Sequence, residues 1–275
     1  MDILQSIILS VIQGLTEFLP ISSSGHLALA DKLFGPHTAD LRFFAIAHLG
    51  TMFATIWVFW DEIIKLFKSL GTIPAAVKEK KLNGDLKMVL YIIIASVPTG
   101  IMGIFLKDKF ESLTSNVIII GVCLVVTGII LLVTRFVKTG ERDQNNFGFL
   151  RALILGTAQG IAILPGVSRS GATIAASLYM GADRKFAGRL SFLISLPAIF
   201  AVNLMEWFDP NAACPADGIV PKLPYIIGFV VSFGVGLLAL KILLKLVENG
   251  KFWVFAFYCF ALGVTAIILG GMGII

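Results

Sequence analysis

Two segments of this chain, 146 positions apart, repeat one pattern of polar and small residues within otherwise apolar sequence. Residues 13–25 read QGLTEFLPISSSG and residues 159–171 read QGIAILPGVSRSG, and the two align without a gap. The copies differ in their reactive groups, and the differing pairs are Glu17 and Ile163, Ser23 and Arg169, and His26 and Ala172. The repeat therefore supplies two similar scaffolds that carry complementary side chains.

The Ser-x-Ser-Gly sequence that ends each copy predicts an anion site. Backbone N–H groups near a helix N-terminus, together with serine hydroxyls, favour phosphate groups. Arg169 adds a permanent charge whose planar fork suits phosphate oxygens, and in an apolar setting that charge needs an anionic partner. We expect the two copies to bind a phosphate-bearing ligand.

Glu17 lies four residues after Gln13, which places the two side chains on one face of a helix. A carboxylate at this point could hold a divalent cation against the phosphate or act as a base. His26, at the end of the first copy, could be an acid, a base or a nucleophile. These groups together indicate chemistry at phosphorus.

The composition of the chain indicates a polytopic membrane protein. Hydrophobic residues make up 57% of its 275 residues and charged residues 14%, and the mean hydropathy is +0.92. A globule of this length cannot hide so much apolar surface, so the solvent of the chain must be lipid. The net charge of +5 then reflects basic loops, and we expect no nucleic-acid partner.

Six stretches are apolar and long enough to cross a hydrocarbon layer of about 30 Å. They are residues 42–60, 88–106, 117–134, 190–207, 223–240 and 252–271. Four loops on one face hold 6, 4, 3 and 3 of the 22 Lys and Arg residues, and they are 61–87, 135–151, 183–189 and 241–251. The positive-inside rule makes that face cytoplasmic, which places both termini outside.

Each repeat copy lies in an apolar stretch that is too interrupted for an ordinary span. Residues 3–35 are broken at Pro20–Gly25 and residues 149–182 at Pro165–Gly171, where Pro, Ser and Gly favour turns. We therefore predict two re-entrant helix–loop–helix hairpins. Three spans separate them, so the hairpins enter from opposite faces and their tips meet near the bilayer midplane.

The predicted fold is an all-α polytopic membrane protein, with six transmembrane helices and two re-entrant hairpins in an inverted-topology repeat. A single integral membrane domain covers residues 1–275. Its first half is 1–135 and its second half is 149–275, and each half is one hairpin followed by three spans.

The motifs QGLTEFLPISSSGH and PGVSRSGAT resemble the undecaprenyl-pyrophosphate (undecaprenyl-diphosphate) phosphatase family, also called the bacitracin-resistance protein family. A third block, MGADRKFAGRLSFLISLP at 180–197, supports the resemblance, which covers the whole chain. It implies an enzyme of the cell membrane that removes the terminal phosphate from a C55 polyprenyl pyrophosphate. The product is the monophosphate carrier for cell-wall and surface-glycan synthesis, and the active site opens to the outer face.

The resemblance also implies roles for individual residues. The expected catalytic residues are Ser23, His26, Glu17 and Arg169. Ser23 and His26 both match groups proposed to attack phosphorus in the family, and we favour Ser23, activated by His26 and Glu17, because a hydroxyl needs a neighbouring base. The expected pyrophosphate-binding residues are Arg169, Ser22, Ser24, Ser168, Ser170, Gly171 and Thr173.

A Mg²⁺ or Ca²⁺ ion is expected at Glu17 and Gln13. Many members of the family carry Glu where this chain has Gln13, which removes one carboxylate from the metal side of the site. Members also carry Glu near Phe44 and Gln at the position of His48. We expect His48 to be an interior packing or hydrogen-bonding residue.

Two other interpretations stay open at this stage. Arg169 and Glu17 could form an ion pair that only holds the hairpins together. A secondary transporter or flippase of a phosphate-bearing anion or prenyl phosphate would also use paired hairpins at mid-depth, although a carrier has no need of Ser, His and Glu within one turn and loop. The expected partners are the polyprenyl pyrophosphate and the bilayer, and a homo-oligomer is left open.

Overall fold

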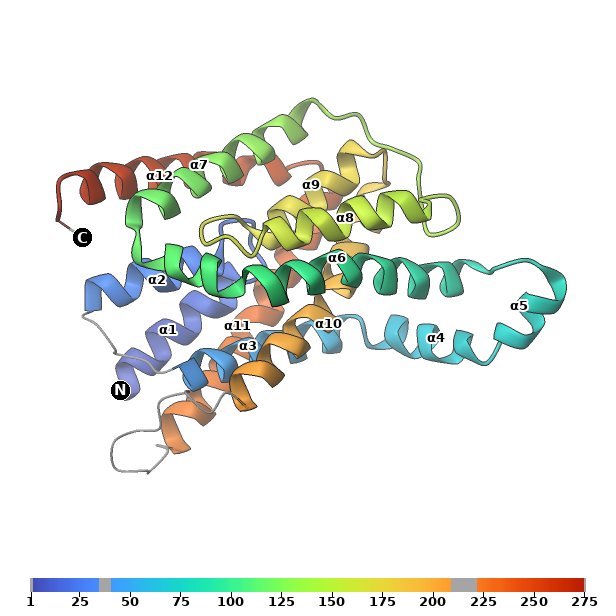
Figure 1. The fold of residues 1–275 in the computed structure, drawn as a ribbon, viewed down its shortest axis with the longest axis horizontal. Helices are drawn as coiled ribbons and strands as arrows, with labels where there is room; N and C mark the ends of the chain where they lie inside the picture. Colours follow the sequence, from blue (N-terminus) through green and yellow to red (C-terminus); the bar gives the residue numbers. More distant parts are fainter. Residues whose placement is uncertain (1, 35–40, 209–221, 275) are drawn as a thin grey trace.

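The described part of the chain is built from helices, drawn as a ribbon in Figure 1. The structure is a computed structural model that describes residues 2–34, 41–208 and 222–274. The α-helices are α1 (Ile3–Thr16), α2 (Ser23–Phe34), α3 (Leu41–Val58), α4 (Trp60–Leu70), α5 (Ile73–Glu79), α6 (Gly84–Ser112), α7 (Val117–Val133), α8 (Phe149–Ile161), α9 (Arg169–Tyr179), α10 (Arg184–Phe208), α11 (Lys222–Glu248) and α12 (Phe255–Gly271). Short 3-10 turns lie at Leu113–Ser115, Thr134–Phe136 and Phe252–Val254.

Several of these helices are long and apolar enough to cross a membrane. Within the described ranges they are Gly84–Leu106, Val117–Phe136, Arg184–Met205, Leu223–Glu248 and Phe252–Gly271. Helices α3 and α4 add a sixth span if the pair, which bends by 75° between Val58 and Trp60, is counted as one. The chain is therefore an all-helical membrane protein with five or six candidate spans.

The predicted loops differ from the structure in their lengths. Most of the segment 61–87 is helical, because α4 and α5 lie within it. Asp61 and Glu62 in the first turn of α4 and Lys68 in its last turn suit the helix dipole. The loops predicted at 183–189 and 241–251 are shorter, since α10 begins at Arg184 and α11 ends at Glu248.

Each repeat copy forms a helix, a tight loop and a second helix, as predicted. The loops are residues 17–22, between α1 and α2, and residues 162–168, between α8 and α9. They begin and end earlier than the predicted breaks, because α1 ends at Thr16 and α8 at Ile161, and Ser23 and Arg169 already start the second helices. With 14 residues in α1 and 13 in α8, each first helix is about 20 Å long at ~1.5 Å per residue and too short to cross a ~30 Å layer.

Helices from the two repeat halves pack against each other in matched pairs. Helix α1 packs on α11 and α8 packs on α6, while α7 lies along α12. Gly14 and Gly160 are equivalent in the repeat. A Cβ added to Gly14 would lie 2.9 Å from Cβ of Val235 in α11, and one added to Gly160 would lie 2.5 Å from the sulfur of Met102 in α6. These small residues let the helix backbones approach closely.

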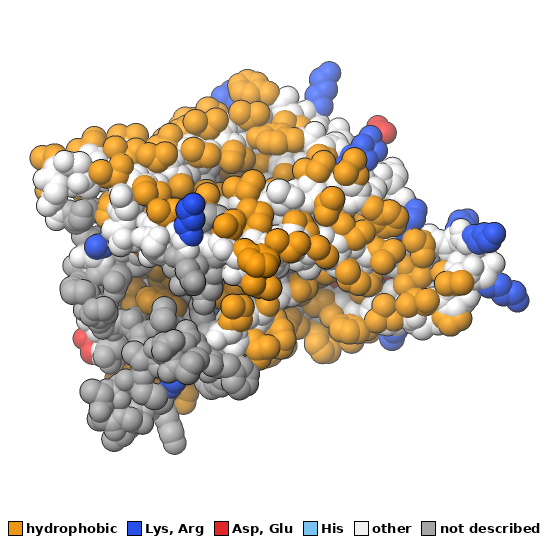
Figure 2. Space-filling model, in the orientation of Figure 1, with side chains coloured by type: hydrophobic (Ala, Val, Ile, Leu, Met, Phe, Trp, Pro, Cys, Tyr) orange, Lys and Arg blue, Asp and Glu red, His pale blue; other side chains and the backbone are white. Residues whose placement is uncertain are grey.

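The basic loops and the chain ends lie at opposite ends of the molecule. In Figure 1 the N- and C-termini are at the left, whereas α5 and the segment between α7 and α8 are at the right. Figure 2, in the same orientation, shows Lys and Arg gathered toward the right-hand end and hydrophobic side chains over the middle. In this view Lys and Arg are therefore more numerous at the end opposite the chain ends.

Candidate functional site

The loops of the two hairpins meet, and we call residues 17–22 tip 1 and residues 162–168 tip 2. The backbone N–H of Gly166 in tip 2 donates a hydrogen bond to Ser22 Oγ in tip 1 at 3.1 Å. A Cβ added to Gly25, just after tip 1, would lie 3.2 Å from Cα of Gly166. The fold therefore brings the two repeat copies into direct contact.

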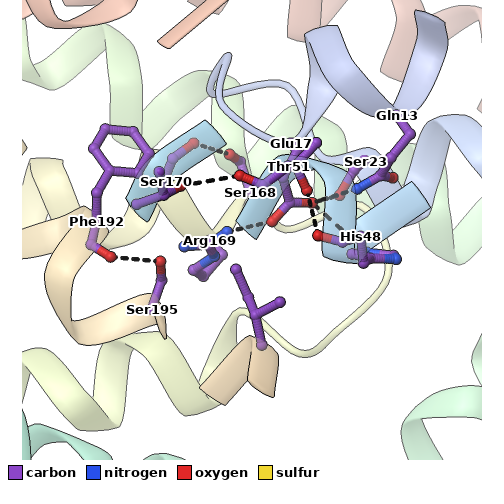
Figure 3. Close-up of polar contacts among 12 residues, drawn as sticks. Gln13, Glu17, Ser23, His48, Thr51, Ser168, Arg169, Ser170, Phe192 and Ser195 are labelled. Carbon is purple, nitrogen blue, oxygen red and sulfur yellow. Dashed lines mark hydrogen bonds and ion pairs between the residues drawn. The ribbon is translucent and has the colours of Figure 1, made fainter. Parts of the chain in front are cut away.

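Glu17 lies among polar side chains from both hairpins (Figure 3). Its Oε2 accepts hydrogen bonds from Ser23 Oγ at 2.8 Å and from Gln13 Nε2 at 3.0 Å. Its Oε1 forms an ion pair with the Arg169 guanidinium. Figure 3 shows Gln13, Ser23 and His48 on one side of Glu17 and Arg169 on the other. One carboxylate thus joins the nucleophile candidate to the anion-binding candidate.

Arg169 is the first residue of α9, next to the N-terminus of that helix. One guanidinium nitrogen, Nη2, contacts Glu17, whereas Nη1 is buried and has no hydrogen-bond partner among the described residues. An unpaired buried donor costs roughly 1–3 kcal/mol. The ion pair that the sequence left open is present, and it leaves one donor free for an oxyanion.

Serine residues cap the second helix of each hairpin in the same way. Ser168 Oγ accepts the backbone N–H of Gly171 at 3.1 Å, and Ser22 Oγ accepts that of Gly25 at 3.3 Å. The neighbouring hydroxyls also pair, and the pairs are Ser168–Ser170 at 3.2 Å and Ser22–Ser24 at 3.3 Å. Two helix N-termini therefore end in capping hydroxyls at the contact between the tips, a geometry that favours anions.

The backbone of Ser22 is strained. Its φ of +69° lies in the left-handed region that residues other than glycine rarely adopt. Such strain persists only where the surrounding structure fixes it. Here the Ser22 carbonyl lies 2.8 Å from Nδ1 of His26, and its hydroxyl accepts the hydrogen bond from Gly166.

Each tip is also held by the last membrane helix of the other repeat half. Thr127 in α7 donates to the Gly166 carbonyl at 3.1 Å and accepts the N–H of Ser168 at 3.2 Å. Cys259 in α12 donates to the Pro20 carbonyl at 3.5 Å. Because Pro20 and Gly166 are equivalent in the repeat, the two braces correspond to each other.

His26 has its partners elsewhere. Its Nδ1 contacts the Ser22 carbonyl, and its Nε2 lies 2.7 Å from the hydroxyl of Tyr258 in α12, whose ring stacks on the imidazole at 5.6 Å. The expected contact with Ser23 is not among the hydrogen bonds of the described residues. Sequence reasoning missed Tyr258, because no local pattern relates residues 232 positions apart.

Thr173, expected to bind pyrophosphate, is buried in α9. Its hydroxyl donates to the Arg169 carbonyl at 2.8 Å and lies 2.5 Å from Ser191 Oγ in α10. These contacts fasten the first turns of α9 to its neighbour. Thr173 therefore supports the backbone of Arg169.

His48 lies beside Glu17, where the sequence suggested only a packing or hydrogen-bonding role. Its Nδ1 does pair with the Phe44 carbonyl, at 2.9 Å, but its Nε2 lies 3.7 Å from Glu17 Oε2. The described residues contain no group of three or more His, Cys, Asp or Glu side chains that could hold a metal. Glu17 and Gln13 still fit a divalent cation, because the buried Oε1 of Gln13 has no hydrogen-bond partner within the described ranges.

Comparison with known proteins connects this site to one family. The sequence profile described as bacitracin resistance protein BacA matches residues 6–265. A protein of Desulforapulum autotrophicum named undecaprenyl-diphosphatase is 41% identical over 98% of this chain and 99% of its own length. Proteins with that name from Treponema denticola, at 41% identity over 96% of each chain, and Methanosphaera stadtmanae, at 38% over 98% of each, are also similar.

Proposed function

Because the chain belongs to the bacitracin resistance protein BacA family, we propose that it is a membrane phosphatase that hydrolyses undecaprenyl pyrophosphate to the monophosphate and inorganic phosphate. The bond that breaks is a phosphoric anhydride. The monophosphate is the lipid carrier for peptidoglycan and other surface glycans, and regenerating it confers resistance to bacitracin. The lipid substrate therefore reaches the enzyme within the bilayer.

One observation carries the assignment of the active site. The hydroxyl of Ser23, the carboxylate of Glu17 and the guanidinium of Arg169 are joined by consecutive contacts where the two tips meet. A phosphoryl transfer needs a nucleophile, a group to accept its proton and a cation to neutralise the phosphate. These three side chains supply those parts.

Arg169 is proposed to bind the pyrophosphate. Its free Nη1 can donate to a phosphate oxygen while Nη2 keeps its contact with Glu17. The caps at Ser22 and Ser168 place helix N-termini beside the same point, and the remaining proposed binding residues are Ser24, Ser170 and Gly171. Thr173 is proposed to act indirectly, by supporting the backbone of Arg169. Preorganised donors of this kind stabilise the charge that develops in the transition state.

The attack on phosphorus is assigned to Ser23. As the bond from Oγ to the terminal phosphorus forms, Glu17 takes the hydroxyl proton and passes it to the departing monophosphate oxygen. Water then hydrolyses the phosphoserine, and Glu17 takes a proton from the water and returns it to Oγ. His26 is assigned to positioning, because its ring holds the Ser22 carbonyl next to Ser23.

A divalent cation, Mg²⁺ or Ca²⁺, would be held by Glu17 and Gln13 and would supply charge neutralisation at the phosphate oxygens. The orphan oxygen of Gln13 supports this placement. The chain's own residues provide the remaining steps.

The arrangement in the membrane is part of the proposal. The short α1 and α8 support two re-entrant hairpins, and the matched pairs α1–α11 and α8–α6 support an inverted repeat of halves 1–135 and 149–275 in one domain. We call the end of the molecule that contains α5 the Lys-rich end. The positive-inside rule places this end on the cytoplasmic side of the cell membrane. The termini and the mouth of the site then face outside.

Phosphate release from undecaprenyl pyrophosphate by the purified protein in detergent tests this function. The wild type should release phosphate, and Arg169→Ala and Ser23→Ala should lose on the order of 10²–10³-fold in kcat, as when a preorganised charge-stabilising group is removed. Arg169→Lys should also be impaired, since the point charge of an ammonium group does not replace the planar set of N–H donors of a guanidinium. Arg151→Ala, at the start of α8, is the matched control and should keep full activity.

Either of two results would overturn the assignment. A wild-type protein that is folded but releases no phosphate with any divalent cation would exclude the phosphatase function. Full activity in Arg169→Ala would be compatible with the phosphatase function but would exclude the proposed active site.

A further inference from the structure

Three electron-pair donors gather on the side of Glu17 that faces away from Arg169 (Figure 3). They are Oε2 of Glu17, the amide oxygen of Gln13 and Nε2 of His48. Gln13 lies in α1, Glu17 directly follows that helix, and His48 lies in α3. The buried carboxylate and the fully buried amide are fixed in place by their contact at 3.0 Å.

Nε2 of His48 faces this group, while a backbone carbonyl holds the other ring nitrogen. Its Nδ1 lies 2.9 Å from the Phe44 carbonyl, which can only accept, so Nδ1 carries the ring proton. The lone pair of the neutral imidazole is then on Nε2, which lies 3.7 Å from Glu17 Oε2. A backbone carbonyl on the far nitrogen is how proteins orient a metal-binding histidine.

The separation of the two donors suits a shared ion. At 3.7 Å, Nε2 and Oε2 are too far apart for a hydrogen bond. Two ligands that each lie about 2.0–2.2 Å from one ion are up to about 4 Å apart. The distance is therefore compatible with one cation between them.

Gln13 supplies the second, independent observation. Its side chain is 0% exposed, and its Oε1 has no hydrogen-bond partner among the residues that the structure describes. Buried amide oxygens are normally satisfied. The amide contacts Glu17 through Nε2, and a flip of the amide would place Oε1 there instead, where an ion would satisfy it.

We propose that His48 is a third ligand of the divalent cation at Glu17 and Gln13, and that its imidazole makes the site prefer first-row transition ions over Mg²⁺ and Ca²⁺. Imidazole nitrogen suits Zn²⁺ and other late first-row ions such as Co²⁺, whereas Mg²⁺, Ca²⁺ and Mn²⁺ suit oxygen ligands. The inference rests on the proposed function, because the ion would lie against the pyrophosphate of the same site.

Titration calorimetry on the full-length protein in detergent, without substrate, tests the proposal. Co²⁺ and Ca²⁺ are titrated into the wild type and into His48→Gln, which keeps a polar side chain but removes the imidazole. Co²⁺ affinity should fall by about 10-fold or more, while Ca²⁺ affinity should change by less than about 3-fold. The matched control is Thr55→Val in the same helix, whose hydroxyl donates to the Thr51 carbonyl; its affinities should equal those of the wild type.

Two further measurements make the test independent of activity. The visible absorption of bound Co²⁺ should differ between wild type and His48→Gln, because a nitrogen ligand has been lost. Gln13→Glu should raise Ca²⁺ affinity by adding a hard oxygen ligand. Equal Co²⁺ affinity in wild type and His48→Gln, or equal weakening of Co²⁺ and Ca²⁺, would overturn the proposal even if phosphate release is normal. Absence of phosphate release with intact Co²⁺ binding would instead count against the proposed function.

Discussion

The contact between Glu17 and Arg169 places two opposite charges inside an apolar bundle. Removing one partner of a buried pair leaves an uncompensated charge and costs roughly 3–5 kcal/mol, whereas replacing both by neutral groups is often tolerated. An ion pair that only held the hairpins together would therefore be replaceable as a unit. A pair that also binds phosphate and accepts a proton would not.

A double-variant experiment separates these roles. Arg169→Met and Glu17→Gln should each lower the thermal unfolding midpoint, because each leaves one charge alone. The double variant Glu17→Gln/Arg169→Met should recover most of the lost stability, while phosphate release stays as low as in the single variants. Unfolding in detergent, followed by fluorescence, and kcat are measured on the same preparations. Return of activity together with stability would show that the pair is only structural.

At the scale of elements, the hairpins were predictable and their neighbours were not. Pro20 and Pro165, each followed by serines, predict a helix break in an apolar stretch, and the structure has both breaks. The first residue of α9 is harder to place, because Arg169 was expected within the loop and instead starts the helix after the Ser168 cap. Helices α4 and α5 were missed, since short helices that carry charged residues do not resemble spans.

The site shows the same limit. Gln13 and Glu17 are four residues apart, so their contact follows from helix geometry. His48 and Tyr258 reach the site from helices α3 and α12, and only the tertiary fold determines which side chain of a long apolar helix faces the tips. Long-range neighbours of this kind leave no periodic signal in one sequence.

Thr127 in α7 also contacts the site from a distant part of the sequence. Its single hydroxyl binds the carbonyl of Gly166 and the N–H of Ser168, so it fixes the backbone of tip 2 immediately before Arg169. Thr127→Val keeps the shape and leaves two backbone groups unpaired. We expect kcat for phosphate release to fall by roughly 10- to 100-fold with a smaller change in KM, because a misplaced guanidinium stabilises the transition state less.

Conservative variants keep this prediction sharp. Thr127→Ser retains the hydroxyl and should recover most of kcat. Thr265→Val removes a hydroxyl that only contacts its own helix α12, at the Ala261 carbonyl, and should leave kcat unchanged. Normal kcat in Thr127→Val together with a loss in Thr127→Ser would mean that the methyl packing of Thr127, and not its hydrogen bonds, matters.

At the scale of the whole molecule, both halves of the sequence contribute to the proposed site. Ser23 and Glu17 come from the first half and Arg169 from the second, and each tip contacts a helix of the opposite half through Thr127 or Cys259. The proposed site therefore requires both halves to be folded together. A detergent assay of phosphate release measures this assembled site without a second compartment, so it distinguishes hydrolysis from transport.

Cysteine labelling can test the orientation of the helices in the membrane. Helix α10 starts at the Lys-rich end and crosses once. If the Lys-rich end is cytoplasmic, the segment after α10 should be external. This segment contains Cys214 and lies outside the described residues. In intact cells a membrane-impermeant maleimide should label native Cys214. The variant Lys80→Cys/Cys214→Ser, with its cysteine after α5, should be labelled only after permeabilisation, because α5 lies at the end of the molecule opposite the chain ends (Figure 1). Cys214→Ser alone serves as the blank, since Cys123 and Cys259 lie within the apolar helices α7 and α12. Labelling of Lys80→Cys in intact cells would reverse the orientation, and the pyrophosphate site would then open toward the cytoplasm.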